Sequence, residues 1–206
     1  DIEWHRRING CWYYIGGKTI YICGSHYFFL NYYKFTNGTF PQFWDSQLFD
    51  FLLLEDSFYN PKVLGEEKIK GRRGGGTAVA LSLELWSITM FRGSKGGIMN
   101  KNETRAEETN FMPLAYAYSC LPMFFQLEPY RSEYEKGKKL QVRKKLDFTG
   151  ATSEYINSFI DYRATKDDIY DGDILRFLLL DEVWKWEHKN PLFAILKLIL
   201  CIKDGG

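Results

Sequence analysis

Beyond residue 60, short apolar runs alternate with segments in which hydrophobic residues recur at helical spacing. We predict strands at 68–70, 96–99, 158–163 and 176–180, of which the last is an apolar run. The helical spacing predicts helices at 78–90, 104–118 and 191–203. Strands that alternate with helices in this order are typical of βαβ units, in which neighbouring strands run parallel. We therefore predict an α/β fold with a mostly parallel sheet flanked by helices.

The first 60 residues have a different pattern, which predicts a small module rich in aromatic side chains. Two β-prone runs, 12–15 and 19–22, flank Gly16-Gly17 and predict a β-hairpin with a tight turn. The aromatic cluster at 26–33 is too dense for a solvent-facing strand. We expect it to pack against the main domain, and stacking on a nucleic-acid base is the alternative.

The end of this module is marked by a helical pattern and a turn. Hydrophobic residues at helical spacing predict a helix over 41–55. Asn60-Pro61 then predicts a turn. We place the domain boundary there, with the aromatic-rich hairpin and helix module at 1–60 and the main domain at 61–206.

The apolar run 177–180 is followed directly by two carboxylates, Asp181 and Glu182. A run of this kind is typical of a strand buried on both faces, and ionised carboxylates are costly to bury there. The tip of such a strand is where ligands bind in open α/β sheets. In a nucleotide hydrolase, one carboxylate at this tip binds Mg²⁺ and a second orients or deprotonates the attacking water. A strand followed by a polar loop is the simpler alternative.

A Gly-rich loop upstream could bind the phosphate on which these carboxylates would act. Residues 70–77 read Lys-Gly-Arg-Arg-Gly-Gly-Gly-Thr and precede a strongly predicted helix. Backbone N–H groups of such a loop approach phosphate oxygens closely, and Thr77 would offer its hydroxyl to Mg²⁺. The lysine usual before the threonine is replaced by Gly76, so Lys70, Arg72 and Arg73 are the cations of this loop. The alternative is a basic, Gly-rich surface turn.

Composition narrows the choice of function only slightly. The 206 residues carry a net charge of +1, so a nucleic-acid partner would need a local basic patch. Four cysteines and three histidines lack the spacing of a zinc or redox site, and no signal peptide is recognisable at the start. The longest apolar stretch, 192–202, is interrupted by Lys197 and is too short for a membrane span, so we expect a buried helix and no membrane partner.

Taken together, these motifs resemble the N-terminal ATPase region of the large terminase subunit of tailed phages, most closely that of crAss-like phages. The matching stretches are 12–33, 70–77, 160–172 and 177–182. The resemblance implies an additional-strand (ASCE/RecA-like) P-loop ATPase. In this fold an extra strand separates the phosphate loop from the acidic strand, and 158–163 fits that role.

The resemblance also implies roles for individual residues. It assigns Mg²⁺ binding to Thr77 and Asp181, and catalysis to Glu182 with Lys70 and Arg73. Gln47 resembles the glutamine that reads adenine in this family. The implied ATP-binding residues are Gln47, Lys70, Gly71, Arg72, Arg73, Gly74, Gly75, Gly76 and Thr77.

The family packages double-stranded DNA into procapsids in the host bacterial cytoplasm. The resemblance therefore implies ATP and Mg²⁺ as cofactors, with the portal protein and a small terminase subunit as partners. It also implies a homo-oligomeric ring, a pentamer, once the motor is assembled. The coupling motif and the nuclease domain of the family are not found up to residue 206, so we expect neither coupling nor DNA cleavage from this chain.

A basic segment at 130–145 is a candidate DNA-binding face. It holds seven basic and two acidic residues, a local charge of +5, which suits the phosphate backbone without sequence reading. A solvated loop or hairpin is the alternative. The predicted DNA-binding residues are Lys138, Lys139, Arg143, Lys144 and Lys145.

Two other functions stay open at this stage. One is a different P-loop ATPase, such as a helicase-like DNA translocase. The other is a non-catalytic module that docks on DNA or portal, because Gly76 departs from the usual phosphate loop. ATP binding and stimulation by procapsids would separate these three functions.

Overall fold

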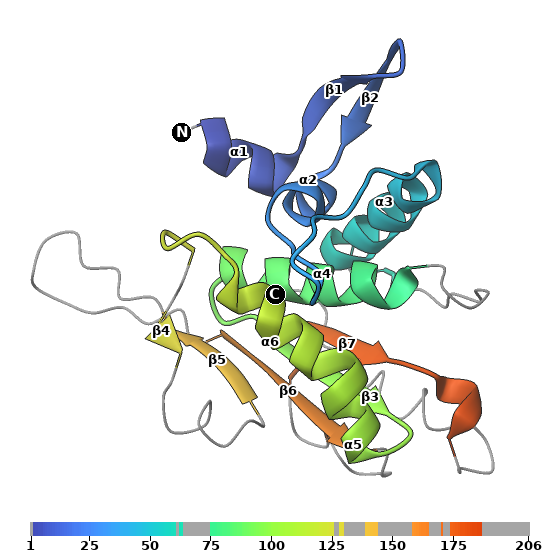
Figure 1. Ribbon diagram of the computed structural model, residues 1–206, viewed down its shortest axis with the longest axis vertical. Coiled ribbons are helices and arrows are strands. Elements are labelled where there is room, and N and C mark those ends of the chain that lie inside the picture. Colours follow the sequence, from blue (N-terminus) through green and yellow to red (C-terminus); the bar gives the residue numbers. More distant parts are fainter. Residues whose placement is uncertain are drawn as a thin grey trace, which may run out of the picture.

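The computed structural model describes residues 2–60, 62–63, 75–125, 128–129, 139–143, 158–164, 170 and 174–186. Within these ranges the chain is an α/β protein whose sheet has the strand order β4-β5-β6-β3-β7 (Figure 1). The strands are β3 (Lys95–Asn100), β4 (Glu128–Pro129), β5 (Lys139–Arg143), β6 (Ser158–Ala164) and β7 (Phe177–Leu180).

The predicted parallel sheet is confirmed for three of these strands. β3 pairs in parallel with both β6 and β7. The antiparallel strands β4 and β5, which the sequence did not predict, extend the sheet beyond β6. The order corrects one expectation: β6 lies on the far side of β3 from β7, so strand 158–163 is not the neighbour that separates the acidic strand from the phosphate loop. β6 has seven residues and includes Asp161 and Arg163, whereas β7 has four apolar residues, but neither pattern states which strand lies beside which.

β3 is the middle one of the three parallel strands, and one of its glycines leaves room for an aromatic ring. A Cβ atom on Gly97 would lie 2.6 Å from the ring of Tyr170 and 3.1 Å from a methyl carbon of Leu175. Met99, Leu175 and Tyr170 are buried together on this face of the sheet. The close approach of Tyr170 therefore requires glycine at position 97.

The opposite face of the sheet is covered by α4 (Gly76–Met90) and by a helical segment made of three parts. These parts are α5 (Glu103–Arg105), the π-helix η1 (Ala106–Phe111) and α6 (Met112–Ser119). Ile98 and Ile160 of the sheet share one core with Leu83 of α4 and Leu114 of α6. The predicted helices at 78–90 and 104–118 are thus confirmed, and the π turn is an addition to the second of them.

The N-terminal part contains α1 (Ile2–Asn9), β1 (Cys11–Ile15), β2 (Lys18–Ile22), α2 (Gly24–Asn31) and α3 (Asp45–Tyr59). The hairpin prediction is confirmed: Ile15 pairs with Lys18 across Gly16 and Gly17, which both have positive φ. The hairpin projects from the rest of the molecule (Figure 1). The predicted helix over 41–55 is confirmed with a shift, since α3 begins at Asp45 and ends at Tyr59.

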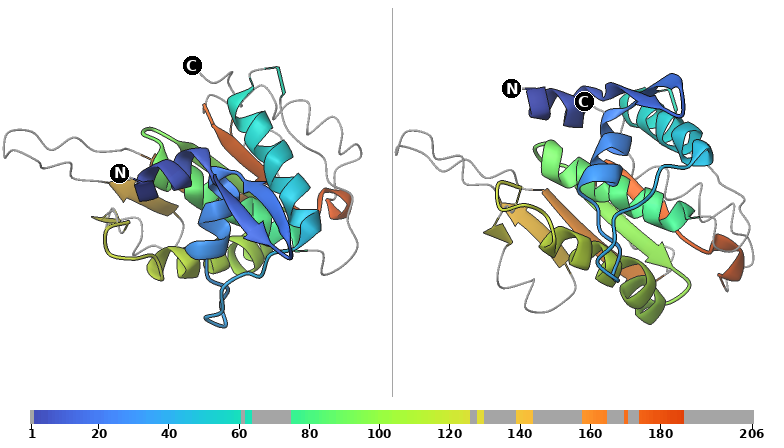
Figure 2. Two further views of the ribbon diagram at one scale, coloured as in Figure 1. Left: turned by 90° about the horizontal axis from the view of Figure 1, so that it is seen from above. Right: turned by 45° about the horizontal axis from the view of Figure 1, so that its top comes forward.

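α4 lies between these N-terminal helices and the sheet (Figure 2). Every residue of α4 from Leu81 to Met90 is buried, including the polar residues Ser82, Glu84, Ser87 and Thr89, so this part of the helix is enclosed around its whole circumference. The aromatic cluster packs on it as predicted, because Phe28 and Phe29 of α2 are fully buried in the same core as Trp86. The boundary after residue 60 stays a prediction about chain organisation. No helix within the described ranges is long and apolar enough to cross a bilayer.

Candidate functional site

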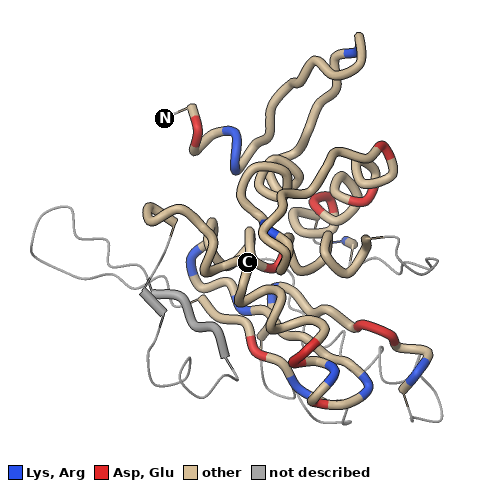
Figure 3. The backbone as a smooth tube through the Cα atoms, in the orientation of Figure 1, with Lys and Arg blue, Asp and Glu red and all other residues tan. Residues whose placement is uncertain are grey.

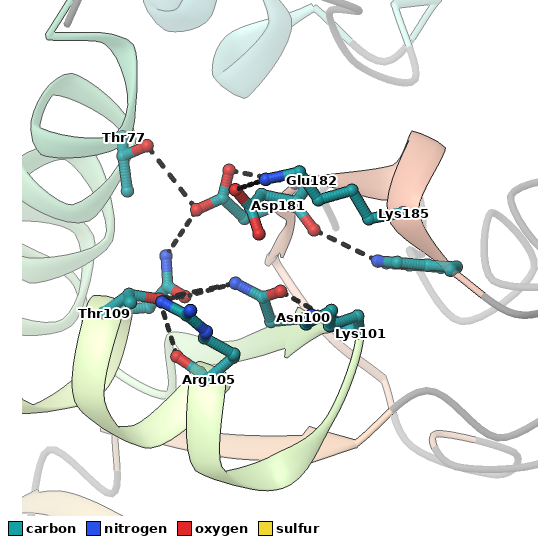
Figure 4. Close-up of polar contacts among 10 residues, drawn as sticks. Thr77, Asn100, Lys101, Arg105, Thr109, Asp181, Glu182 and Lys185 are labelled. Atoms are coloured by element: carbon teal, nitrogen blue, oxygen red, sulfur yellow. Dashed lines mark hydrogen bonds and ion pairs between the residues drawn. The ribbon is translucent and has the colours of Figure 1, made fainter. Parts of the chain in front are cut away.

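The predicted carboxylate and the predicted hydroxyl meet at one edge of the sheet. Asp181 follows the last residue of β7, and its backbone N–H donates to the Met99 carbonyl at 3.0 Å, which continues the ladder with β3. Thr77 lies in the first turn of α4, after Gly75 in the left-handed conformation at the N-cap. The Thr77 Oγ1 donates to Asp181 Oδ2 at 3.5 Å although the two residues are 104 positions apart (Figure 4).

The carboxylate of Asp181 is held at both oxygens. Oδ1 accepts from the backbone N–H of Glu182 at 3.0 Å. Oδ2 accepts from Nδ2 of Asn110 at 2.8 Å, in addition to the longer contact with Thr77. The Asp181 carbonyl accepts from the indole N–H of Trp186 at 3.1 Å. These contacts fix the carboxylate toward the start of α4.

A network of amides and a hydroxyl continues from Asp181 to the neighbouring strand. Asn110 of the π-helix is fully buried, and its Oδ1 accepts from Asn100 Nδ2 at 3.0 Å and from Thr109 Oγ1 at 2.9 Å. Asn100 is the last residue of β3 and is 1 % exposed. The tips of two parallel strands are therefore joined through the π-helix (Figure 4).

Glu182 has an unusual backbone and a cationic environment. Among the described residues it is the only residue other than glycine with a positive φ, which is 52°. Its carboxylate is ion-paired with Lys185 (Figure 4). The hydrogen bond from Lys185 lowers the pKa of Glu182, burial opposes this effect, and Arg105 and Lys101 add weaker lowering effects at longer range. In Figure 3 the acidic stretch after β7 is followed along the chain by a basic one. Left-handed backbone at a non-glycine residue is enriched at functional sites.

Comparisons with models of known protein families, with curated proteins and with solved structures found no match to the chain. The fold class and the site geometry are therefore the observations on which a function must be argued.

Most of the predicted phosphate loop lies outside the described residues. Gly75, Gly76 and Thr77 are described and form the start of α4. The strand predicted at 68–70 and the helix predicted at 191–203 also lie outside the described residues. The loop residues outside them are Lys70, Gly71, Arg72, Arg73 and Gly74.

The predicted DNA-binding residues fall partly on a strand. Lys139 and Arg143 are the first and last residues of β5, which pairs with β4 and β6. Lys138, Lys144 and Lys145 lie outside the described residues. Part of the basic segment is thus strand rather than loop, and its role with DNA stays a prediction.

Gln47, the predicted adenine contact, lies close to the start of α4. It is 5 % exposed, and its Nε2 is 3.8 Å from the position that a Cβ would take on Gly75. Its Oε1 is buried and has no hydrogen-bond partner. Gln47 thus approaches the phosphate loop from α3 and presents an unused acceptor.

The site offers oxygen atoms of the kind that bind Mg²⁺, from the Thr77 hydroxyl and the Asp181 carboxylate. The described residues contain no group of three or more His, Cys, Asp or Glu side chains that could hold a metal ion. Mg²⁺ needs no such group, because it retains several waters and uses one or two protein oxygens. Adjacent ligands of an octahedral ion at about 2.1 Å lie about 3 Å apart. Thr77 Oγ1 and Asp181 Oδ2 are 3.5 Å apart, so these two oxygens could be ligands of one such ion after moving closer by about 0.5 Å.

Asn100 and Asn110 are site residues that sequence reasoning missed. Asn100 could have been found, because it follows an apolar run just as Asp181 does, and parallel strands end at the same edge of a sheet. Asn110 carries no such signal. It lies in a helix, and its position at the site depends on a π turn that the hydrophobic pattern does not reveal.

Proposed function

We propose that the chain binds and hydrolyses ATP with Mg²⁺ at the site formed by Thr77 and Asp181. One observation carries the proposal. A hydroxyl in the first turn of a helix and a carboxylate at the end of a parallel strand approach to 3.5 Å across 104 residues of sequence. P-loop nucleotide hydrolases hold Mg²⁺ with this pair of groups from these two elements.

The start of α4 supports the same function. Its first backbone N–H groups have no partner within the helix, and the helix dipole adds partial positive charge, so the position favours phosphate. Thr77 and Asp181 would hold Mg²⁺, which when bound neutralises charge on the phosphates. Lys70, Arg72 and Arg73 are the proposed cations of the loop, and Gly71 and Gly74 are proposed to belong to the same ATP-binding segment.

Glu182 is the proposed group that orients or deprotonates the attacking water. It follows the metal-binding aspartate directly, and Lys185 keeps its pKa low, so the carboxylate is ionised at neutral pH. An ionised carboxylate accepts a hydrogen bond from the water and so directs a lone pair of the water oxygen toward the phosphate. Gln47 is the proposed adenine contact, because its buried Oε1 is available to accept from the exocyclic amine.

The resemblance extends the proposal to a cellular role. We infer that the chain is the ATPase region of a viral DNA-packaging motor, which works as a ring on the portal in the host bacterial cytoplasm. The segment 130–145 is the proposed contact with the DNA backbone. Stimulation of ATP hydrolysis by procapsids carrying portal supports this role, whereas unwinding of DNA supports a helicase-like translocase.

The test of ATP hydrolysis is the variant Glu182→Gln. It keeps the shape of the side chain but removes the carboxylate that acts on water. We expect ATP binding by calorimetry within twofold of the parent chain and turnover reduced by about 10²- to 10⁴-fold.

Glu108→Gln is the matched control, because it makes the same change at an exposed glutamate of the π-helix. We expect this control to retain the parent rate. Turnover at the parent rate in Glu182→Gln would contradict the role of Glu182. A parent chain that binds no ATP would favour the non-catalytic module.

A further inference from the structure

We propose that Asn110 is a positioning residue for metal binding: it sets the orientation of the Asp181 carboxylate from a π-helix. This inference rests on the proposed function and adds a residue that neither the phosphate loop nor the acidic strand contains. Its basis is the direct hydrogen bond from Asn110 Nδ2 to Asp181 Oδ2 at 2.8 Å.

The orientation of the Asn110 side chain is restricted by its burial and by its hydrogen bonds. It is fully buried, and its amide is engaged at both ends. Nδ2 donates to Asp181, while Oδ1 accepts from Asn100 at 3.0 Å and from Thr109 at 2.9 Å. The Lys101 backbone N–H donates to Asn100 Oδ1 at 2.7 Å, so Asn100 presents its Nδ2 donor to Asn110. The atom of Asn110 that meets this donor is therefore Oδ1, and Nδ2 is the end that faces the carboxylate.

The π turn is the element that brings this side chain to the strand tips. η1 lies between α5 and α6, and its wider turn differs from the α-helical spacing on either side. Phe111 packs on Tyr162 of β6 with ring centroids 4.8 Å apart. The preceding residue, Asn110, donates its hydrogen bond to Asp181, which follows the end of β7. π-Helical turns of this kind occur frequently at functional sites.

The contact leaves Asp181 able to bind a metal. A carboxylate oxygen has two lone-pair positions, and Asn110 occupies one of them on Oδ2. The same oxygen is the one that faces Thr77 Oγ1 at 3.5 Å. Asn110 therefore holds the oxygen that the proposed ion would share with Thr77, and partners of this kind typically change metal affinity by 10- to 100-fold.

The test compares Asn110→Ala with Asn31→Ala in the full 206-residue chain. Asn31 also donates from its amide to an oxygen, the Tyr27 carbonyl at 2.8 Å, but it lies in α2 away from the site. Two quantities are measured: Mn²⁺ binding in the presence of a non-hydrolysable ATP analogue, by electron paramagnetic resonance, and the Mg²⁺ concentration that gives half-maximal ATP hydrolysis. Thermal melting reports whether each variant is folded.

We expect Asn110→Ala to weaken Mn²⁺ binding and to raise the half-maximal Mg²⁺ concentration by about 10-fold or more. The KM for ATP at saturating Mg²⁺ should stay within twofold, and Asn31→Ala should behave like the parent. If Asn110→Ala does not fold, Asn110→Asp is used instead, and the added carboxylate should also change the metal affinity. A folded Asn110 variant with the metal affinity of the parent overturns the positioning role while the proposed function stands. A parent chain that binds neither nucleotide nor Mn²⁺ overturns both.

Discussion

At the scale of single residues, His26 is buried in an unusual way. Its ring is stacked on Phe51 at 4.5 Å and on Phe43 at 5.6 Å between centroids. Both ring nitrogens are buried and have no hydrogen-bond partner. Burial disfavours the charged imidazolium and lowers the pKa of His26 to about 4. The folded protein therefore holds this histidine in its neutral form.

This burial predicts a loss of stability in acid. The unfolded chain takes up a proton at His26 near pH 6.5, whereas the folded chain does so only near pH 4. The free energy of unfolding should therefore fall as the pH is lowered from 6.5 to 4, by about 3 kcal/mol from this group. Urea unfolding at several pH values measures the slope.

The substitution His26→Phe should remove that part of the slope, because phenylalanine stacks between the same rings without titrating. The same substitution at His5, which is exposed, is the matched control and should leave the slope unchanged. An identical pH dependence in His26→Phe and in the parent would mean that His26 does not titrate as its burial implies.

At the scale of elements, the local sequence pattern was enough to predict some helices and strands, whereas the positions of others depend on tertiary contacts. The hairpin, α4, β6 and β7 were predictable because their side-chain period or turn residues are local properties. The position of β3 between β6 and β7 was not, since strand order is set by tertiary contacts, among them the close packing of Tyr170 on Gly97. Thr77 and Asp181 were predictable for a similar reason, because each adjoins a recognisable element. The π turn that positions Asn110 was not predictable from the sequence.

The central strand gives a prediction of its own. In Gly97→Ala the new Cβ would lie 2.6 Å from the Tyr170 ring, so the ring or the strand must move. We expect the free energy of unfolding to fall by about 1–3 kcal/mol, as for other overpacked cores. Gly96→Ala, where the nearest atom is Ile160 Cγ1 at 3.0 Å, should cost less. Denaturant titration compares the two, and equal stability of Gly97→Ala and the parent would contradict the packing argument.

At the scale of the whole molecule, the two predicted domains contribute side chains to one common hydrophobic core. Phe28, Phe29 and Phe51 of the first 60 residues lie in the same core as Leu83 and Trp86 of α4. The indole N–H of Trp86 also donates to the carbonyl of Arg7 at 2.7 Å. α4 is therefore buried on one side by the sheet and on the other by the N-terminal helices.

We expect that a fragment comprising residues 61–206 does not fold cooperatively. Removing the first 60 residues would expose the face of α4 that includes Trp86, a large apolar surface that favours aggregation. Thermal melting monitored by circular dichroism and by light scattering tests this expectation. A soluble fragment with a sharp melting transition would show that residues 61–206 form an independent domain.

The ion pair between Glu182 and Lys185 has a consequence for timing. On the proposed function, the carboxylate that acts on water is held by a lysine three residues along the chain. A partly exposed pair of this kind is weak, and its side chains change rotamer within nanoseconds, so the lysine would not delay cleavage once ATP and water are in place. If the isolated chain turns over slowly when saturated with nucleotide, the slow step therefore lies elsewhere than in this contact.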